Sequence, residues 1–374
     1  MRDAAQDAWR AIEAARDLGF ALAGVAPAEP SKHADHVRGW IARGEHGEMD
    51  YLARNLEVRL DPRELVPGAK SILMVADAYA PGAGETTTAG ASPAEPGSDL
   101  RGRGRVRGRV ARYAWGDDYH KVMKKRMHAL ADTLRGDAAT DGDGQASDAE
   151  VWRACVDTAP LLEREHAAAA GLGFIGRNTL LIHPRHGSYL LLGALVTTRE
   201  LAATERLIEL DAERARSVGL VPPTDHCGHC TRCIDACPTG CITDPRLPDG
   251  SIDPAAPRAI DASRCISYLT IEHRGEIPDD LRGNLDGWVA GCDVCQEVCP
   301  FNDIGGRNPL PIHERYAPRD EVAHGLRMDA VARWTDEDRA RVTRGSALKR
   351  IKLAMWRRNA EANLENPARE NRDA

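Results

Sequence analysis

The hydrophobic pattern at the start of the chain predicts helices followed by one buried strand. Residues 1–20 place acidic, basic and apolar side chains with a helical period. The apolar run Ile72–Tyr79 follows the turn-forming sequence PGAK and has the length of a buried strand. A second amphipathic helix is predicted over 117–134, with one apolar side formed by Val122, Met123, Met127, Leu130 and Leu134.

The pattern then predicts further strands around a short helix. Val151–Asp157 is strand-like, and the next segment predicts a helix that begins near Pro160 and ends at Gly171. The segments 179–184 and 188–198 predict two strands of a hairpin about the turn RHGS. Such alternation of helices and strands is typical of an α/β or α+β domain.

Composition divides the chain into three predicted parts. The α/β or α+β domain spans 1–205, a cysteine-rich domain spans 206–305, and a mostly helical region spans 306–374. Two polar segments rich in small residues, 83–104 and 136–149, cannot bury a core. We therefore expect them to be flexible insertions.

Charge and hydropathy indicate a cytoplasmic protein. The formal net charge is −7, so an anionic partner would need local basic patches rather than the overall field. The longest clean apolar run, Tyr189–Val196, is too short to cross a bilayer, and residues 1–20 lack the apolar core of an export signal. We expect no membrane partner. In the cytoplasm, clustered cysteines bind metals more often than they form disulfides.

Eight of the ten cysteines fit a pair of iron–sulfur motifs. Residues 227–238 read C-x2-C-x2-C-x3-C-P, the bacterial ferredoxin pattern in which the fourth cysteine binds the other of two [4Fe–4S] clusters. Residues 292–300 read C-x2-C-x3-C-P, and Cys265 is the natural replacement for the cysteine that this half lacks. We assign one cluster to Cys227, Cys230, Cys233 and Cys299, and the other to Cys237, Cys265, Cys292 and Cys295.

Zinc is the alternative for these thiols, because it accepts sites of four cysteines. Zinc sites usually pair two C-x2-C knuckles, unlike the three linked C-x2-C spacings and the duplicated C-P endings seen here. The two remaining cysteines, Cys155 and Cys241, are expected to be inert buried thiols. Clusters of this kind transfer single electrons, so the cysteine-rich segment alone indicates an electron conduit.

Two further motifs are misleading in their predicted context. The string GLGFIG at 171–176 matches G-x-G-x-x-G, but a predicted helix precedes it and a strand follows, the reverse of a dinucleotide site. Asp118 and His120 begin the Asp-x-His-x-x-Gly string of some cobalamin enzymes, but Met123 replaces the glycine. Asp157 lies at a strand end beside a helix start, where a carboxylate commonly caps the helix.

Several long stretches of the chain resemble the epoxyqueuosine reductase family. The stretches that carry the resemblance cover most of the chain: 55–73 (NLEVRLDPRELVPGAKSIL), 111–127 (ARYAWGDDYHKVMKKRM), 153–193, 263–278 (SRCISYLTIEHRGEIP) and 291–302 (GCDVCQEVCPFN), together with the double cluster motif.

The resemblance implies an α+β protein with a defined activity. An N-terminal α/β domain similar to the reductive dehalogenase core would hold a base-off cobalamin, beside a ferredoxin-like domain with two [4Fe–4S] clusters and a short C-terminal helical segment. The implied reaction reduces epoxyqueuosine to queuosine in the tRNA anticodon loop, with electrons passing from the clusters to cobalamin. Asp157 matches the family's proton donor, and enclosure by the corrin and apolar side chains would raise its pKa.

The resemblance also implies the remaining site residues and partners. The partners are tRNA carrying epoxyqueuosine and a low-potential electron donor that the sequence does not identify, and we expect a monomer. The cobalamin contacts would be Arg59, Tyr113, Asp157, Ile175, Gly176, Arg177, Asn178, His183, Ser188, Ser267 and Tyr268. The expected phosphate contacts are Lys121, Lys124, Lys125 and Arg126, and Lys349, Arg350, Lys352, Arg357 and Arg358, whereas the arginine-rich stretch 101–112 stays unassigned.

Two other functions keep the same motifs. An electron-carrier subunit would have the clusters, no corrin and a protein partner. A reductive dehalogenase-like enzyme would have both cofactors and act on small molecules, although the basic patches and the lack of an export signal argue against it.

Overall fold

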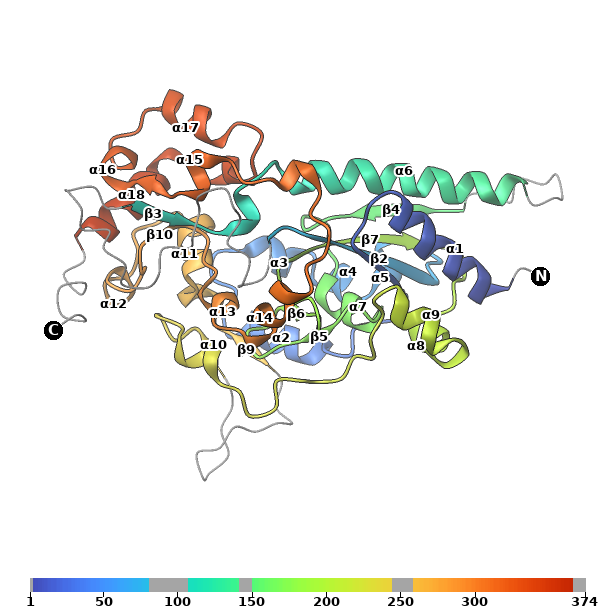
Figure 1. Ribbon diagram of the computed structural model, residues 1–374. Coiled ribbons are helices and arrows are strands. Elements are labelled where there is room, and N and C mark those ends of the chain that lie inside the picture. Colours follow the sequence, from blue (N-terminus) through green and yellow to red (C-terminus); the bar gives the residue numbers. More distant parts are fainter. Residues whose placement is uncertain (1–2, 81–106, 141–149, 244–257, 366–374) are drawn as a thin grey trace, which may run out of the picture.

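A four-stranded antiparallel sheet forms the centre of the N-terminal part of the chain (Figure 1). The computed structural model describes residues 3–80, 107–140, 150–243 and 258–365. The strand order is β1-β2-β7-β4, with β1 at Leu22–Pro27, β2 at Ser71–Ala78, β7 at Leu190–Thr197 and β4 at Trp152–Cys155. The apolar residues of the two central strands are almost all buried, because helices cover both faces of the sheet.

Two pairs of helices cover this sheet. Helices α1 (Ala4–Asp17) and α6 (Tyr119–Thr140) lie on one face, and α7 (Glu163–Ala169) and α8 (Thr204–Leu210) lie on the other. The face under α7 and α8 is so closely packed that a Cβ added at Gly24 of β1 would lie 2.0 Å from the carbonyl oxygen of Ala170. Only glycine fits there, and its absent side chain lets α7 approach the sheet.

A second, smaller sheet joins segments from all three predicted parts. Its order is β10-β3-β11, with β3 (Arg107–Val110) between β10 (Trp288–Ala290) and β11 (Leu326–Arg327). Helix α18 (Leu353–Leu364) packs against β10, and its Trp356 is fully buried beside Trp334. The C-terminal segment is therefore part of a common core, while the predicted domain boundaries stay a prediction.

The remaining elements are short and connect these two cores. They are α2 (Ala34–Ala42), α3 (Asp50–Arg54), α4 (Leu56–Leu60), α5 (Pro62–Leu65), α9 (Ala212–Ser217), α10 (Arg232–Asp235), α11 (Ile266–Ile271), α12 (Asp279–Arg282), α13 (Val294–Glu297), α14 (Pro300–Arg307), α15 (Asp320–Ala323), α16 (Met328–Val331) and α17 (Asp336–Thr343), with β5 (Phe174–Ile175), β6 (Leu181–Ile182), β8 (Ile242–Thr243), β9 (Ala259–Ile260) and four short 3-10 helices.

The mixed helix and sheet class is confirmed, but three local predictions were wrong. The first 80 residues contain β1 as well as the predicted β2, because the short run of β1 carries no clear alternation. Strand β6 pairs with β5 instead of forming a hairpin with β7, which inserts between β2 and β4 where its unbroken apolar run is buried. Helix α6 continues to Thr140, into the start of the segment predicted to be flexible.

The rest of both predicted insertions, 83–104 and 141–149, lies outside the described residues. Within the described part of the chain, no helix is both long enough and apolar enough to cross a bilayer.

Candidate active site and cluster-binding segment

The candidate site lies at the edge of the large sheet that is formed by the C-terminal ends of β2 and β4. Both strands pair antiparallel with β7, so they run in the same direction and finish at the same edge. Asp157 lies two residues beyond the end of β4 and has a φ of 50°, a left-handed conformation that is uncommon for any residue except glycine. Its side chain is 47% exposed, so this strained position presents a carboxylate to the outside of the core.

His120 joins this carboxylate to a second one. Its Nε2 lies 3.0 Å from Asp157 Oδ2, and its Nδ1 lies 2.8 Å from Asp118 Oδ1. The histidine belongs to the first turn of α6, where Asp118 Oδ1 also accepts from its backbone N–H at 3.2 Å. The start of α6 therefore fixes the imidazole ring between two carboxylates.

The pairing with His120 affects the pKa of Asp157, which we expected to be raised. Burial alone would raise the pKa of Asp157, but the hydrogen bond from His120, with Arg350 and Tyr119 nearby, lowers it overall. The two carboxylates in turn raise the pKa of His120 against the opposing effect of burial. Without a corrin, the pKa of Asp157 is therefore lowered and that of His120 is raised. The expected rise in the pKa of Asp157 concerns the corrin-enclosed site and stays a prediction.

A second acidic group stabilises the strained loop by accepting a hydrogen bond from its backbone. Glu163, at the start of α7, accepts a hydrogen bond from the backbone N–H of Asp157 at 2.6 Å. Burial, and then the neighbouring charge of Asp157, raise the pKa of Glu163 to about 8. Arg59, a predicted cofactor contact, donates to the carbonyl oxygen of Leu161 at 3.3 Å. It also interacts electrostatically with Glu163 and Asp157.

Tyrosine rings and an ion pair complete the surroundings of Asp157. Tyr119 stacks on His120 with ring centroids 4.0 Å apart, and Tyr113, another predicted cofactor contact, meets Tyr119 edge-on at 6.1 Å. Arg350 pairs with Glu272 at 2.6 Å and interacts electrostatically with Asp157. A residue predicted to contact tRNA thus lies beside the predicted catalytic carboxylate.

The predicted cofactor residues 175–178 form a turn that contacts the cysteine-rich segment. Ile175 ends β5, and Gly176, Arg177 and Asn178 lie in the turn that leads to β6. Arg177 donates to the carbonyl oxygen of Gly228 at 2.7 Å, and Asn178 donates to that of Cys295 at 3.3 Å. The turn therefore joins the sheet domain to both cysteine motifs.

His183 and Ser188 are buried and have their hydrogen bonds within the protein. His183 Nε2 lies 3.0 Å from the carbonyl oxygen of Gly219, and its Nδ1 accepts from two backbone N–H groups. Burial lowers the pKa of His183 to about 3, so the ring is neutral. Ser188 Oγ donates to Gln296 at 3.0 Å, and its N–H donates to Asn302 at 2.7 Å. Both residues hold the sheet domain against its neighbours.

Ser267 and Tyr268 lie in α11, which begins just after Cys265. The hydroxyl oxygen of Tyr268 accepts from the backbone N–H of Glu48 at 2.7 Å, and its ring lies against Gly47. Tyr268 thereby joins α11 to the loop that precedes α3, while Ser267 is half-buried.

The cysteine side chains lie near one another in two groups, while their assignment as cluster ligands stays a prediction. Burial, followed by the charges of Cys227, Cys299 and Cys230, raises the pKa of Cys233 to about 12. Cys292 and Cys295 interact in the same way with each other and with Cys265. The two groups lie next to each other, because the charge of Cys233 also raises the pKa of Cys295.

Cys155 and Cys241 differ in their surroundings. Both are buried, but Cys155 is part of the large apolar core, and its sulfur donates to the carbonyl oxygen of Arg153 at 3.7 Å. The sulfur of Cys241 lies 3.4 Å from that of Cys237 and also hydrogen-bonds to Cys265. Cys241 is therefore part of the cysteine cluster rather than an isolated thiol.

Among the described residues, no group of three His, Cys, Asp or Glu side chains is close enough to hold a single metal ion. A four-iron cluster spreads its thiolates farther apart, because each thiolate binds a different iron atom.

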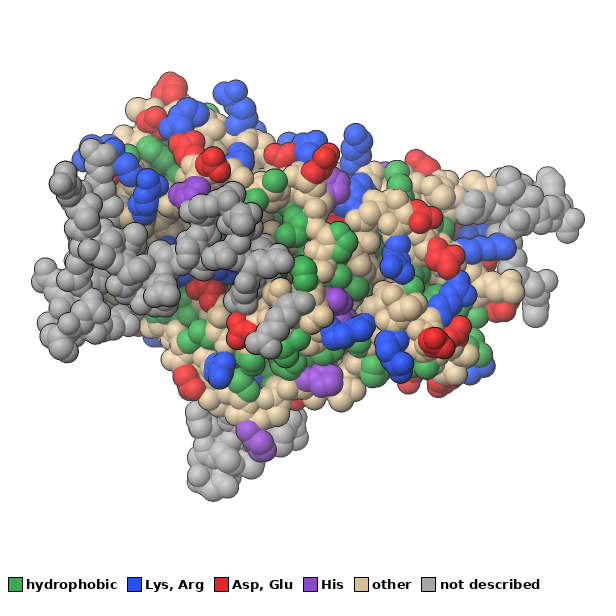
Figure 2. All heavy atoms as spheres, in the orientation of Figure 1, with side chains coloured by type: hydrophobic (Ala, Val, Ile, Leu, Met, Phe, Trp, Pro, Cys, Tyr) green, Lys and Arg blue, Asp and Glu red, His purple; other side chains and the backbone are tan. Residues whose placement is uncertain are grey.

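The basic residues predicted to contact tRNA fall into buried and exposed groups. Arg126 pairs with the buried Asp77 at 2.6 Å and stacks on Phe20, and the buried Arg358 donates to backbone carbonyls of α11 and the loop after it. These two predictions were wrong, because both guanidinium groups are structural. The exposed members are Lys121, Lys124, Lys125, Lys349, Arg350, Lys352 and Arg357. Figure 2 shows basic and acidic side chains interspersed over one face of the molecule.

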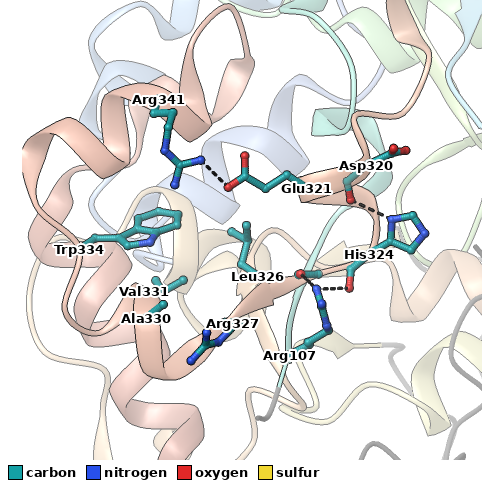
Figure 3. A pocket seen from close by; sticks show the side chains of 11 residues that line it. Arg107, Asp320, Glu321, His324, Leu326, Arg327, Ala330, Val331, Trp334 and Arg341 are labelled. Carbon is teal, nitrogen blue, oxygen red and sulfur yellow. Dashed lines mark hydrogen bonds and ion pairs between the residues drawn. The ribbon is translucent and has the colours of Figure 1, made fainter.

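A cavity of about 450 Å³ lies elsewhere, in the C-terminal region (Figure 3). Trp334 and Leu326 form its apolar wall, and its cations are engaged: Arg341 pairs with Glu321 at 2.7 Å, and Arg107 donates to the carbonyl oxygens of His324 and Gly325. None of the predicted site residues lines it.

Comparison with known proteins covers both regions. Residues 59–158 match the family model "Epoxyqueuosine reductase QueG, DUF1730", and residues 226–302 match "4Fe-4S double cluster binding domain". An epoxyqueuosine reductase of Pseudomonas aeruginosa is 34% identical over 94% of this chain and 83% of its own length. One from a Synechococcus species is 37% identical over 92% of this chain and 90% of its own length.

Solved structures show the same likeness. A crystal structure of an epoxyqueuosine reductase with a tRNA-Tyr epoxyqueuosine-modified stem loop has a TM-score of 0.74 and 27% identity, covering 98% of this chain and 84% of that one. A Bacillus subtilis epoxyqueuosine reductase, whose catalytic loop is swung out of the active site, has a TM-score of 0.73 and 26% identity, covering 97% of this chain and 82% of that one.

Sequence reasoning missed the residues that surround Asp157. Asp118 and His120 were noticed only as a failed cobalt-binding string, and Glu163 was not singled out. The usable signal was the position of the Asp-x-His pair at the start of a helix, but Asp157, the partner of His120 in the loop after β4, is 37 positions away along the chain.

Proposed function

The chain belongs to the epoxyqueuosine reductase family, and we propose a route by which it reduces epoxyqueuosine to queuosine in the anticodon loop of tRNA. The reaction turns an epoxide into an alkene, so it consumes two electrons and two protons and releases the oxygen as water. A source of electrons, a group that acts on carbon and a proton donor are therefore needed.

The observation that carries this proposal is the position of Asp157 within the reductase-specific segment. The match over residues 59–158 includes Asp157 and three residues from separate segments that interact with its carboxylate: Arg59, Tyr113 and His120. The same chain carries the double-cluster domain over residues 226–302. These two matches support a proton-donating site and an electron supply in one protein.

Base-off cobalamin fits the residues around Asp157. Arg59 Nε is buried and has no hydrogen-bond partner among the described residues, so it is available to a polar ligand group. We assign the corrinoid contacts to Arg59, Tyr113, the turn 175–178 and the α11 residues Ser267 and Tyr268. The buried residues His183 and Ser188 would stabilise these contacts through their hydrogen bonds within the protein. When bound there, cobalamin would supply a two-electron nucleophile for carbon.

Electrons reach this site through the cysteine-rich segment. Cys265 and Cys292, both assigned to the second cluster, pack against the same apolar side chains as Tyr113. Cys227 and Cys299 pack instead in a separate apolar group with Phe174. We therefore place the second cluster between the first cluster and the corrinoid site, with a low-potential donor reducing the first.

The proton is held by Asp157 and His120 as a pair. Their mutual hydrogen bond lets the pair keep one proton between them, and Asp118 orients the ring from the other side. Asp157 is the exposed member and donates to the departing epoxide oxygen, while His120 replaces the proton on the carboxylate. Glu163 fixes the loop through the backbone N–H of Asp157.

The tRNA is held by the exposed cations near this edge of the sheet. Lys121, Lys124 and Lys125 follow His120 along α6, and Arg350 lies beside Asp157. Phosphate contacts of this kind position the anticodon loop while the modified base is turned out toward Asp157. We place the protein in the cytoplasm, as a monomer.

The experiment is anaerobic turnover with cobalamin-loaded protein on two substrates, tRNA carrying epoxyqueuosine and a haloarene. We expect queuosine in the tRNA and no dehalogenation. Dehalogenation alone would favour the reductive dehalogenase-like function. Protein with intact clusters that binds no corrin and turns over neither substrate would favour the electron-carrier function.

A further inference from the structure

Cys241 is held against the cluster ligands by a tight turn. The segment Cys237–Gly240 turns back on itself with a hydrogen bond from the N–H of Gly240 to the carbonyl oxygen of Cys237 at 3.1 Å. Gly240 has a φ of 60°, a conformation that glycine adopts without strain. The turn brings the Cys241 sulfur to 3.4 Å from the Cys237 sulfur.

The position of Cys241 is fixed on both sides. Its carbonyl oxygen accepts from the N–H of Asp261 at 2.9 Å, and the strand β8 that follows pairs with β9. Only 3% of Cys241 is exposed. Its thiol also hydrogen-bonds to Cys265, so it connects two thiols that are 28 positions apart in the sequence and belong to one predicted cluster.

The second cluster has four ligands without Cys241. A [4Fe–4S] cluster takes one thiolate for each iron, and Cys237, Cys265, Cys292 and Cys295 provide them. A ligating thiolate has no proton and can only accept, whereas the remaining thiol keeps its S–H group as a donor. Thr239 adds a buried hydroxyl 3.6 Å from the Cys237 sulfur.

We propose that Cys241 is a non-ligating thiol whose single S–H group donates a hydrogen bond to the thiolate of Cys237 or Cys265 and thereby raises the reduction potential of the second cluster. Reduction adds one negative charge to a cluster, and donors aimed at its sulfurs stabilise that charge. Because the second cluster is the one nearer Asp157, a higher potential there draws single electrons inward from the first cluster. The inference rests on the cluster assignment in the proposed function.

The test is a redox titration of the holoprotein followed by electron paramagnetic resonance. Cys241→Ala should keep about eight irons per chain and make the potential of one cluster more negative. We expect about a tenfold change in its reduced-to-oxidised ratio, which corresponds to about 59 mV. Cys241→Ser, which keeps a donor, should shift the potential less. The control Cys155→Ala removes a buried thiol that contacts neither ligand and should shift neither cluster.

Two results would overturn this inference. Unchanged potentials in Cys241→Ala would remove the donor role, and loss of about half the iron in that variant would make Cys241 a ligand instead. Neither result bears on the reductase activity, because queuosine formation by the wild-type protein is measured separately. Wild-type protein that assembles no iron–sulfur cluster would overturn both proposals together.

Discussion

His120 Nε2 lies 3.0 Å from Asp157 Oδ2, so the first turn of α6 holds the carboxylate that follows β4. The contact links α6 to the loop after β4, in which Asp157 has a strained backbone conformation. It also decides where the proton resides, since the pKa of Asp157 is lowered and that of His120 is raised. The pair, rather than either residue alone, is the proton donor in our account.

Replacing Asp157 with asparagine should stop the chemistry without disturbing binding. Asparagine keeps the size of the side chain but cannot donate an acidic proton, so turnover should fall about 10²- to 10⁴-fold. Iron content, corrin absorbance and tRNA affinity should remain those of the wild type. Asp329→Asn, which changes a half-buried aspartate of the C-terminal region that pairs with Arg327, is the matched control. Near-normal turnover in Asp157→Asn would remove the role assigned to this carboxylate.

Replacing His120 with glutamine should move the pH dependence of turnover. In the wild type the raised pKa of His120 keeps the pair protonated above the usual value of 6.5, and activity falls as the pH rises through that raised value. In the variant, Asp157 has lost its histidine partner and must hold the proton alone. Activity should then fall at lower pH, because a carboxyl group releases its proton more readily than an imidazolium.

The pH profile of kcat in the two proteins checks this shift. The other groups that interact with the pair are unchanged in the variant; they are Arg59, Asp118, Tyr119, Glu163 and Arg350. A profile that keeps its basic limb in place, with only a lower plateau, would indicate that His120 merely supports the fold.

Replacing Glu163 with glutamine should change how stability depends on pH. The pKa of Glu163 rises on folding from 4.5 to about 8, so its stabilising contribution is fully present below 4.5 and is lost as the pH rises through 8. The glutamine variant has no proton to lose there. Its melting temperature should decline less between pH 5 and pH 9 than that of the wild type.

Thermal melts across this pH range, with Glu361→Gln as the exposed control, measure the difference. Parallel pH dependences in the wild type and Glu163→Gln would show that Glu163 is already ionised in the folded protein at low pH.

Replacing Lys121, Lys124 and Lys125 with glutamine should weaken tRNA binding through electrostatics alone. Each phosphate contact that is lost should reduce the slope of log affinity against log salt by about 1. The control is Lys70→Gln, which removes an exposed lysine at the opposite edge of the large sheet. An unchanged salt slope in the triple variant would place the RNA on another surface.

The local signals in the sequence predicted the parts of the site that depend on spacing. The cysteine motifs fixed which residues gather, since the pattern of C-x2-C and C-P units already determines how the chain wraps around a cluster. The apolar periods likewise located α1, β2, α6 and β4.

Features that depend on distant contacts were not predictable in this way. Arg126 has the charge of a surface residue, but the buried Asp77 turns it inward. Cys241 follows a common C-P-T-G turn, yet its importance depends on Cys265 arriving from another segment. The contact between His120 and Asp157 likewise depends on the packing of α6 against β4.

The measurement that tests the central claim most directly is queuosine formation as a function of bound corrin. Anaerobic protein with both clusters intact is loaded with increasing amounts of cobalamin and given tRNA carrying epoxyqueuosine. We predict that the rate rises in proportion to the corrin bound and is absent without it. An equal rate in corrin-free protein would contradict the account.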